Sequence, residues 1–156
     1  MPRRLPAGAE IVPGGVDFRV WASRRRRVEV VLEGGPGSPA VVALQAEAGG
    51  WFRGTVPGAG SGSRYRFRLD GEGPFPDPAS RSQPDGPHGA SEVLDPASFR
   101  WTCTGWRGAP LPGQVLYELH CGTFTRAGTW AAAALELPAL AGLGVTAVSL
   151  MPANAF

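Results

Sequence analysis

The sequence contains no lysine, so all 15 of its basic residues are arginines. It has 13 acidic residues, and the formal charge of +2 is too small to indicate a polyanionic partner. The one dense basic run is Arg24–Arg27. Nucleic-acid binding would need a broader basic face with interleaved aromatic residues. We therefore interpret this run as a solvated hairpin connection between two strands and predict no nucleic-acid partner.

Cysteine is also scarce, since only Cys103 and Cys121 occur. Their spacing matches no metal-binding pattern, so we predict that both are reduced and that the chain has no metal site. The sequence has no nucleophile elbow and no phosphate-binding glycine loop, and the lone Gly71–Gly73 segment is only a turn signal. No cofactor is therefore predicted.

Long apolar runs are absent as well. No stretch reaches the roughly 18 apolar residues that a membrane-spanning helix needs. The N-terminal residues 1–6 lack the apolar segment of a signal peptide. We therefore expect no membrane partner and a cytoplasmic location.

Glycine and proline are abundant instead, with 23 and 16 residues, which indicates many turns and few long helices. Up to Trp101, short apolar runs recur between turn residues, and in the clearest run, Arg64–Leu69, apolar residues alternate with arginines. This pattern predicts a mostly β chain that begins with an antiparallel, immunoglobulin-like β-sandwich, with a barrel as the alternative. The expected strands are Val16–Trp21, Val28–Leu32, Val41–Leu44, Trp51–Val56, Arg64–Leu69 and Ser98–Trp101.

The tryptophans raise the question of a carbohydrate-binding platform, because apolar sugar faces stack on exposed aromatic rings. Burial is the commoner fate of a tryptophan in a sandwich, so we predict a core position for each of them. The five tryptophans are Trp21, Trp51, Trp101, Trp106 and Trp130.

The segment Gly71–Ser91 is too rich in proline and glycine for a helix or a central strand. Its side chains Arg81, Gln83 and His88 can form anchoring hydrogen bonds, so we predict an ordered loop rather than a disordered one. Structural anchoring is favoured over substrate contact as its main role.

The character of the sequence changes at Gln114–Thr125. Val115–Leu119 is mostly apolar on both alternating faces, which predicts a strand that is covered on both sides. Glu118 and His120 interrupt this pattern on the face of Leu116, because side chains two apart in a strand point the same way. A carboxylate and an imidazole on a covered strand need polar partners, so we expect them at a strand end, near a cavity or in a hydrogen-bonded cluster.

A helix and a second strand should follow. Thr129 is the expected N-cap, Pro138 should kink or restart the helix, and Gly144 suits the C-terminal cap. Val145–Leu150 should then form a strand buried on both faces, completing a right-handed βαβ unit. The expected apolar face of the helix consists of Trp130, Ala134, Leu137 and Ala141.

Two segments resemble a known family. The run YELHCGTFT from Tyr117, followed by GTW, a helix, LGVTAVSLMP and NAF, is similar to the first strand, helix and second strand of an alpha-amylase superfamily (β/α)8 barrel. Asp77–Ser91 resembles the linker loop of the malto-oligosyltrehalose trehalohydrolase family within that superfamily. Cys121 stands where this family usually carries a small apolar residue.

The resemblance implies three parts. These are an immunoglobulin-like β-sandwich at residues 1–100 that includes the loop 71–91, a connection at 101–113, and the incomplete start of a catalytic barrel at 114–156. It also implies a parent glycoside hydrolase that cleaves the α-1,4 bond next to the terminal trehalose unit of maltooligosyl trehalose and releases trehalose. The implied partner of the complete protein is an α-glucan or maltooligosyl trehalose.

No catalytic residue is expected in this chain. In the superfamily the catalytic carboxylates follow barrel strands four, five and seven, which this length of sequence does not reach, so the fragment itself should be inactive. The candidates for substrate binding or pocket lining are Glu118, His120, Arg81 and His88. A stand-alone α-glucan-binding module, and the N-terminal part of a glycogen branching or debranching enzyme, are the alternative functions.

Overall fold

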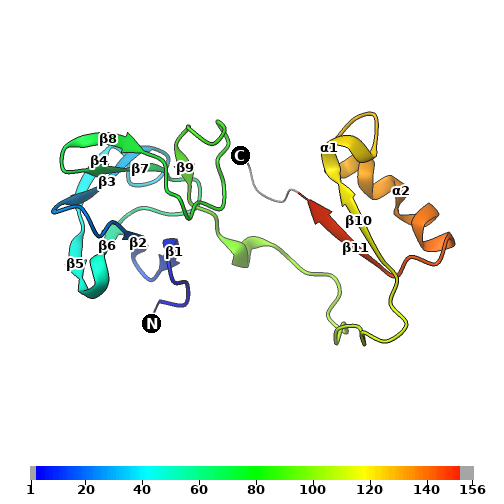
Figure 1. Ribbon diagram of the computed structural model, residues 1–156. Coiled ribbons are helices and arrows are strands. Elements are labelled where there is room, and N and C mark those ends of the chain that lie inside the picture. The colour runs from blue at the N-terminus through cyan, green and yellow to red at the C-terminus, as the bar shows by residue number, and fades with distance from the viewer. Residues whose placement is uncertain (1–2, 152–156) are drawn as a thin grey trace. The chain divides into compact units, whose positions relative to one another are not determined.

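The computed structural model describes residues 3–151, and they form two compact units that divide between residues 100 and 101 (Figure 1). The first unit consists mainly of strands, and the second contains two strands and two helices. The prediction of a mostly β chain is therefore confirmed. No helix of residues 3–151 has both the length and the apolar character needed to cross a membrane.

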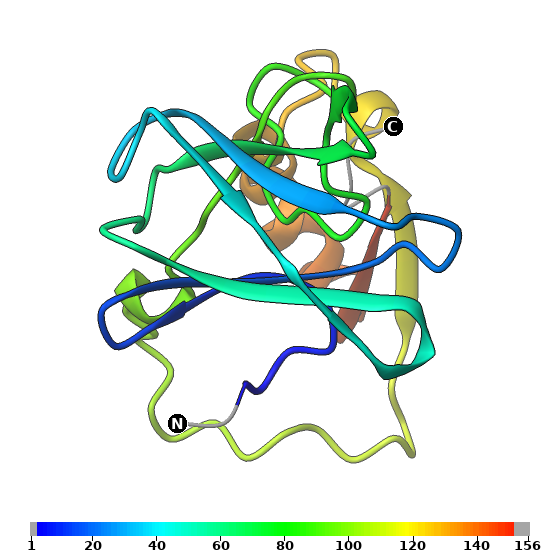
Figure 2. The same cartoon turned by 90° about the vertical axis from the view of Figure 1, so that its left-hand side faces the viewer.

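The first unit is a sandwich of two antiparallel sheets, which appear as two layers in Figure 2. Sheet A has the strand order β1 (Gly8–Val12), β2 (Gly15–Trp21), β6 (Trp51–Pro57) and β5 (Gln45–Glu47). Sheet B has the order β4 (Ala40–Ala43), β3 (Val28–Gly34), β7 (Arg64–Leu69) and β8 (Glu72–Phe75), and β9 (Ser91–Glu92) also pairs with β7. The predicted β-sandwich is confirmed, and its immunoglobulin-like character stays a prediction.

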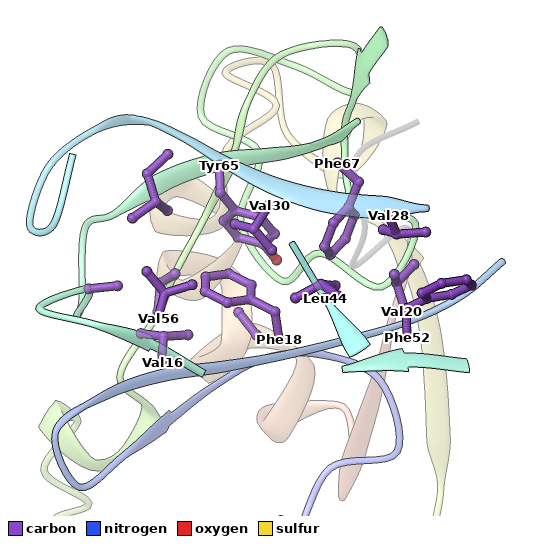
Figure 3. Close-up of a cluster of buried hydrophobic side chains, with 14 residues drawn as sticks. Val16, Phe18, Val20, Val28, Val30, Leu44, Phe52, Val56, Tyr65 and Phe67 are labelled. Atoms are coloured by element: carbon purple, nitrogen blue, oxygen red, sulfur yellow. The ribbon is translucent and has the colours of Figure 1, made fainter. Parts of the chain in front are cut away.

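The core of this unit follows from the two-residue period of its strands. Alternate side chains of both sheets point toward one another in Figure 3, and burying each contributes about 1.5–3 kcal/mol. The rings of Phe18 and Phe67 pack edge-on against Tyr65, with centroids 4.8 and 5.8 Å from it. The buried residues labelled there are Val16, Phe18, Val20, Val28, Val30, Leu44, Phe52, Val56, Tyr65 and Phe67.

Five of the six predicted strands of this unit are present, but the strand at Ser98–Trp101 is wrong. Pro96–Ser98 forms a 3-10 turn instead, capped by Asp95, whose side chain accepts a hydrogen bond from the amide of Ala97. The missed strands β1, β5, β8 and β9 are short. β8 contains Pro74, and it tolerates this residue because it pairs only with β7 at the edge of sheet B.

The hairpin predicted at Arg24–Arg27 is also wrong. β2 belongs to sheet A and β3 to sheet B, so the run crosses from one sheet to the other. Asp70 stabilises this crossing, because its Oδ1 accepts hydrogen bonds from the amides of Arg26 and Arg27 at 2.9 and 2.8 Å.

In the second unit, two parallel strands are joined by helices, while the prediction that this unit begins a barrel stays a prediction. β10 (Leu116–His120) leads into α1 (Cys121–Phe124) and α2 (Trp130–Gly142), and β11 (Ala147–Met151) pairs with β10 in register Leu116 to Ala147. The NAF segment, residues 154–156, lies outside the described residues.

The two ends of α2 match the prediction, and of the two outcomes predicted at Pro138, a kink or a restart, the restart is excluded. Thr129 caps the start of α2 by accepting a hydrogen bond from the amide of Ala132 at 3.2 Å. Gly144 follows the helix with φ +93°, a conformation that glycine adopts without strain. Pro138 lies inside α2, which runs through it rather than restarting.

Burial in the second unit differs from the prediction. β10 and β11 were expected to be covered on both faces, yet Leu119 is the one buried residue of β10, and β11 has none in the part described. The buried residues of α2 are Ala133 and Leu140, so the predicted face of Trp130, Ala134, Leu137 and Ala141 is wrong. Within this unit the helices lie against a sheet of only two strands, so there is too little surface to cover the rest.

Truncating a core ring should destabilise the sandwich. Phe67→Ala should lower the free energy of unfolding by about 3–5 kcal/mol, because it removes a buried ring and leaves a cavity. Phe75→Ala, at an exposed phenylalanine on β8, should cost about 1 kcal/mol or less. Urea denaturation of the two variants and the parent chain would check this, and equal costs would contradict the assigned core.

Candidate functional site

Glu118 and His120 lie together on one face of β10. Both are exposed, as is Leu116 two residues before Glu118, whereas Leu119 between them is buried on the opposite face. His120 is the last residue of the strand, and its Nδ1 lies 3.3 Å from the hydroxyl of Thr123. Among the described residues no hydrogen bond joins Glu118 to His120.

Arg81 anchors the proline-rich loop to the N-terminal segment of the same unit. Its guanidinium donates hydrogen bonds to the carbonyl oxygens of Ala9 at 2.9 Å and Ala7 at 3.5 Å. Gln83 braces the loop internally by donating to the carbonyl of Pro87 at 3.1 Å. His88 is exposed near the tip. Arg81 and His88 belong to the first unit and Glu118 and His120 to the second, so each pair is placed within its own unit.

A buried hydrogen-bond cluster joins this loop to the core. The hydroxyl of Tyr65 donates to Oδ2 of Asp77 at 2.6 Å, and both residues are almost completely buried. Asp77 Oδ1 accepts from the amide of Ala79 at 2.8 Å, and the Asp77 amide donates to the hydroxyl of Ser91 at 2.9 Å. The loop is therefore fixed at its start and at its end.

Burial shifts the titration of both groups in this cluster. Desolvation raises the pKa of Asp77, although the Tyr65 hydroxyl, the Ala79 amide and the Arg81 guanidinium favour its ionised form. Desolvation also raises the pKa of Tyr65, with a further contribution from the neighbouring Asp77 charge. Both carboxylate oxygens of Asp77 already accept hydrogen bonds within the unit, so we interpret the arrangement as a structural anchor.

The prediction that every tryptophan lies in the core is wrong. Trp21 is 59% exposed, Trp101 and Trp106 are each 73% exposed, and Trp130 is 48% exposed. Trp51 is partly buried. Sequence alternation carries the signal that was missed: Val20 and Phe52 point into the core, so their neighbours Trp21 and Trp51 must point outward.

Trp21 and Trp51 sit side by side on the outer face of sheet A. They are directly opposite each other in the antiparallel register of β2 and β6. The Trp21 Nε1 donates to the carbonyl of Gly49 at 2.9 Å, and the Arg19 guanidinium lies 4.0 Å from the centre of a Trp51 ring. Arg19 also donates to Glu47 Oε2 at 2.8 Å. We call this group, Arg19, Trp21, Glu47 and Trp51, the tryptophan platform.

A polar hollow of about 350 Å³ adjoins the tryptophan platform. Arg19 and Glu47 belong to both, and the segment Arg3–Pro6 and Arg53 complete its lining. Planar aromatic surface beside paired donors and acceptors is the usual composition of a site for a hydroxyl-rich ligand.

Comparison with known proteins gives a consistent result. Residues 6–97 match the family model of carbohydrate-binding module 48, the isoamylase N-terminal domain. Malto-oligosyltrehalose trehalohydrolases from Rhizobium sp. (strain M-11) and Deinococcus radiodurans are 42% and 44% identical to 95% and 98% of this chain. A 1,4-alpha-glucan branching enzyme from Ralstonia nicotianae is 37% identical over 88% of the chain and 21% of that protein.

A solved structure shares this architecture. The crystal structure of a protein described as an alpha amylase from Salmonella typhimurium has a TM-score of 0.86 and 40% identity, and covers 97% of this chain. The match takes up 25% of that structure's chain, and the present chain spans about a quarter of the trehalohydrolases as well. The resemblance to malto-oligosyltrehalose trehalohydrolases is confirmed by these identities.

Replacing the buried carboxyl should change how stability depends on pH. Because the pKa of Asp77 is raised in the folded state, the folded chain binds more protons at this group than the unfolded chain does. Its contribution to the free energy of unfolding should therefore grow as the pH falls toward about 4, where the unfolded group is half protonated. Asp77→Asn removes this titration.

We expect the stability of the parent chain relative to Asp77→Asn to rise as the pH is lowered from 7 to 4, as measured by urea denaturation at each pH. Asp85→Asn, at an exposed carboxyl in the same loop, is the matched control. A difference that stays flat or moves in the opposite direction would show that the pKa of Asp77 is not raised by folding.

Proposed function

The chain belongs to the carbohydrate-binding module 48 family, and we propose that it supplies the N-terminal sandwich and the first barrel elements of a trehalose-releasing glycoside hydrolase. The complete enzyme would cleave the α-1,4 bond next to the terminal trehalose unit of maltooligosyl trehalose by a retaining double displacement. The observation that carries this proposal is the 42–44% identity to trehalohydrolases, which extends across both units rather than the sandwich alone.

The second unit fits the beginning of a (β/α)8 barrel. Its parallel strands are joined by a crossover that contains α2, as parallel pairing requires. In such a barrel the helices cover the outside, and the other face of each strand points inward. The open face of β10, with Leu116, Glu118 and His120, is therefore the inner face in this proposal.

The position of Glu118 and His120 along β10 supports a role in the substrate pocket. Active sites of these barrels lie at the C-terminal ends of the strands. His120 ends β10, and Glu118 lies two residues before it on the same face. We assign both to the lining of the pocket floor, with no part in bond cleavage.

The proline-rich loop has a divided role in this proposal. Arg81 donates its hydrogen bonds to the backbone of the same unit, so its role is to fix the loop. His88 is exposed, and in this proposal it is available to a substrate or to the barrel. The proposed domains are the sandwich at residues 1–100, the connection at 101–113 and the start of the barrel at 114–156.

The buried carboxyl groups of the first unit all have structural partners, so we assign none of them as a catalytic group of a retaining glycosidase. The two catalytic carboxyl groups of such an enzyme stand about 5–5.5 Å apart across the scissile bond. The buried carboxylates of the first unit, Glu10, Asp17, Glu29 and Asp77, are committed to arginine, tyrosine or backbone partners. Glu118 is exposed on β10, two residues before His120. In this proposal the catalytic carboxylates belong to the part of the enzyme that corresponds to the remaining three quarters of the trehalohydrolases.

A branching enzyme is the second candidate, because one such relative is 37% identical to the chain. The product separates the two: a trehalohydrolase releases trehalose, whereas a branching enzyme transfers glucan without releasing it. A stand-alone glucan-binding module would account for the sandwich but leaves the open face of β10 unexplained.

The purified 156-residue chain should release no trehalose from maltooligosyl trehalose, because it lacks the catalytic carboxylates. The assay is chromatographic detection of trehalose after prolonged incubation. The Deinococcus radiodurans relative serves as the positive control. Turnover above the buffer blank would overturn the assignment of the chain as a non-catalytic part.

A chimera tests the parent activity. The matching quarter of the Deinococcus radiodurans protein, to which the chain is 44% identical, is replaced by this chain. We expect the chimera to release trehalose, while the same protein with that quarter deleted does not. A chimera that folds but forms branched glucan instead would contradict the proposal.

In the active chimera, Glu118→Gln combined with His120→Asn should lower kcat/KM by about tenfold or more, because these side chains line the pocket. Glu136→Gln, at an exposed carboxylate of α2, is the matched control and should change it little. Equal kcat/KM in both variants would show that Glu118 and His120 do not line the pocket.

A further inference from the structure

A hollow of about 750 Å³ lies where the crossing Arg24–Arg27 meets the outer face of sheet B. Glu29 of β3 and Arg68 of β7 are directly opposite each other in the antiparallel register. Both belong to the outer face, because their neighbours Val30 and Phe67 point into the core. We call this hollow the arginine hollow, and its lining consists of Arg26, Arg27, Glu29, Arg68, Asp70 and Gly71.

The backbone around the arginine hollow is held in place by Asp70. Its Oδ1 accepts hydrogen bonds from the amides of Arg26 and Arg27, and its own amide donates to the carbonyl of Arg27 at 2.9 Å. Gly71 follows with φ +89°, a conformation that glycine adopts without strain. The crossing and the turn between β7 and β8 are therefore tied together, which reduces the cost of ordering them when a ligand binds.

Positive charge in the arginine hollow is only partly neutralised. Glu29 is shared between two arginines, with Oε1 at 2.7 Å from Arg27 Nη2 and Oε2 at 3.8 Å from Arg68 Nη1. Asp70 already accepts hydrogen bonds from two backbone amides. Among residues 3–151, no carboxylate forms an ion pair with Arg26. Three guanidinium groups therefore line the hollow with two carboxylates, and both carboxylates have other partners.

Other arginines of the first unit are less available to an anion. Carboxylate oxygens lie 2.8 Å from Arg19 and 3.0 Å from Arg53, and Asp85 lies 2.7 Å from Arg64. An anion would have to displace these close partners. In the arginine hollow, Arg26 has no such partner, and the long, solvent-exposed contact of Arg68 with Glu29 contributes little. Anions should therefore bind at the arginine hollow in preference to these other arginines.

We propose that the arginine hollow binds the phosphate group of a small molecule through the guanidinium groups of Arg26 and Arg68. The planar guanidinium matches the spacing of phosphate oxygens and stays charged at every physiological pH. A small excess of positive charge suits one phosphate group rather than a nucleic acid. The ligand is inorganic phosphate or a phosphate monoester, since the volume also leaves room for an attached group. This site does not depend on the proposed parent activity.

The test is isothermal titration calorimetry of the full 156-residue chain with inorganic phosphate and, separately, with glycerol 3-phosphate. The ionic strength is held constant with sodium chloride, because salt screens non-specific attraction. Arg26→Gln should raise Kd by about tenfold, since it removes a charge-assisted hydrogen bond. Arg24→Gln is the matched control, because it makes the same change of charge in the same run but lies outside the lining. It should change Kd by less than about twofold.

A second variant should strengthen binding. Glu29→Gln should lower Kd by about threefold or more, because Glu29 competes with phosphate for Arg27 and Arg68. Glu33→Gln is its control, since Glu33 pairs with Arg66 outside the hollow, and it should leave Kd nearly unchanged. Partial unfolding would weaken binding, so it cannot imitate this gain. Thermal unfolding of each variant without ligand checks that the sandwich stays intact.

The two ligands identify the source of the phosphate group. Tighter binding of glycerol 3-phosphate would show that the hollow also contacts the attached group, and equal binding would show that it recognises phosphate alone. Both results support the proposal. The absence of measurable heat with either ligand would overturn it. Equal effects of Arg26→Gln and Arg24→Gln would also overturn it, because they would show attraction to the net charge of the run rather than a defined site.

Discussion

The hydrogen bond from Tyr65 to Asp77 connects the core of the sandwich to its longest irregular segment. The ring of Tyr65 packs edge-on against Phe18 and Phe67, so the position of its hydroxyl is set by the core. Asp77 accepts from that hydroxyl at 2.6 Å and also organises the first turn of the loop. A proline-rich loop cannot satisfy its own backbone by regular pairing, and this anchor gives it a fixed origin.

The anchor continues outward from Asp77. Ser91 accepts a hydrogen bond from the Asp77 amide and then enters β9, which pairs with β7. Arg81, four residues after Asp77, donates a hydrogen bond to the carbonyl of Ala9 in β1. The loop therefore joins both sheets of the first unit at their edges, and one buried carboxylate supports all of these contacts. Because the pKa of Asp77 is raised by burial, this support has an electrostatic cost that the surrounding hydrogen bonds offset.

Strands with strict alternation could be predicted from sequence, and the same alternation indicates which side chains of β2 and β6 point outward. In β7, arginines alternate with Tyr65, Phe67 and Leu69, and periodicity alone identifies the buried side. Short edge strands such as β5 and β8 carry too few residues to show a period. We predicted that β10 is buried on both faces because its residues are mostly apolar. An apolar strand is expected to pack against other elements, but its sequence does not show whether those elements belong to the same unit. Trp21 and Trp51 were misplaced because the prediction followed the usual burial of tryptophan in a sandwich rather than their positions in the alternation.

The sheet formed by β10 and β11 has consequences for association. It has two strands among the described residues, so each has one edge whose backbone amides and carbonyls lack a strand partner. An unpaired edge is a template for any extended segment of matching length, and proteins normally protect such edges. These two edges would accept an extended segment that pairs with β10 or β11 through its backbone. Backbone hydrogen bonding at these edges is therefore a constraint on the second unit in addition to its exposed apolar side chains.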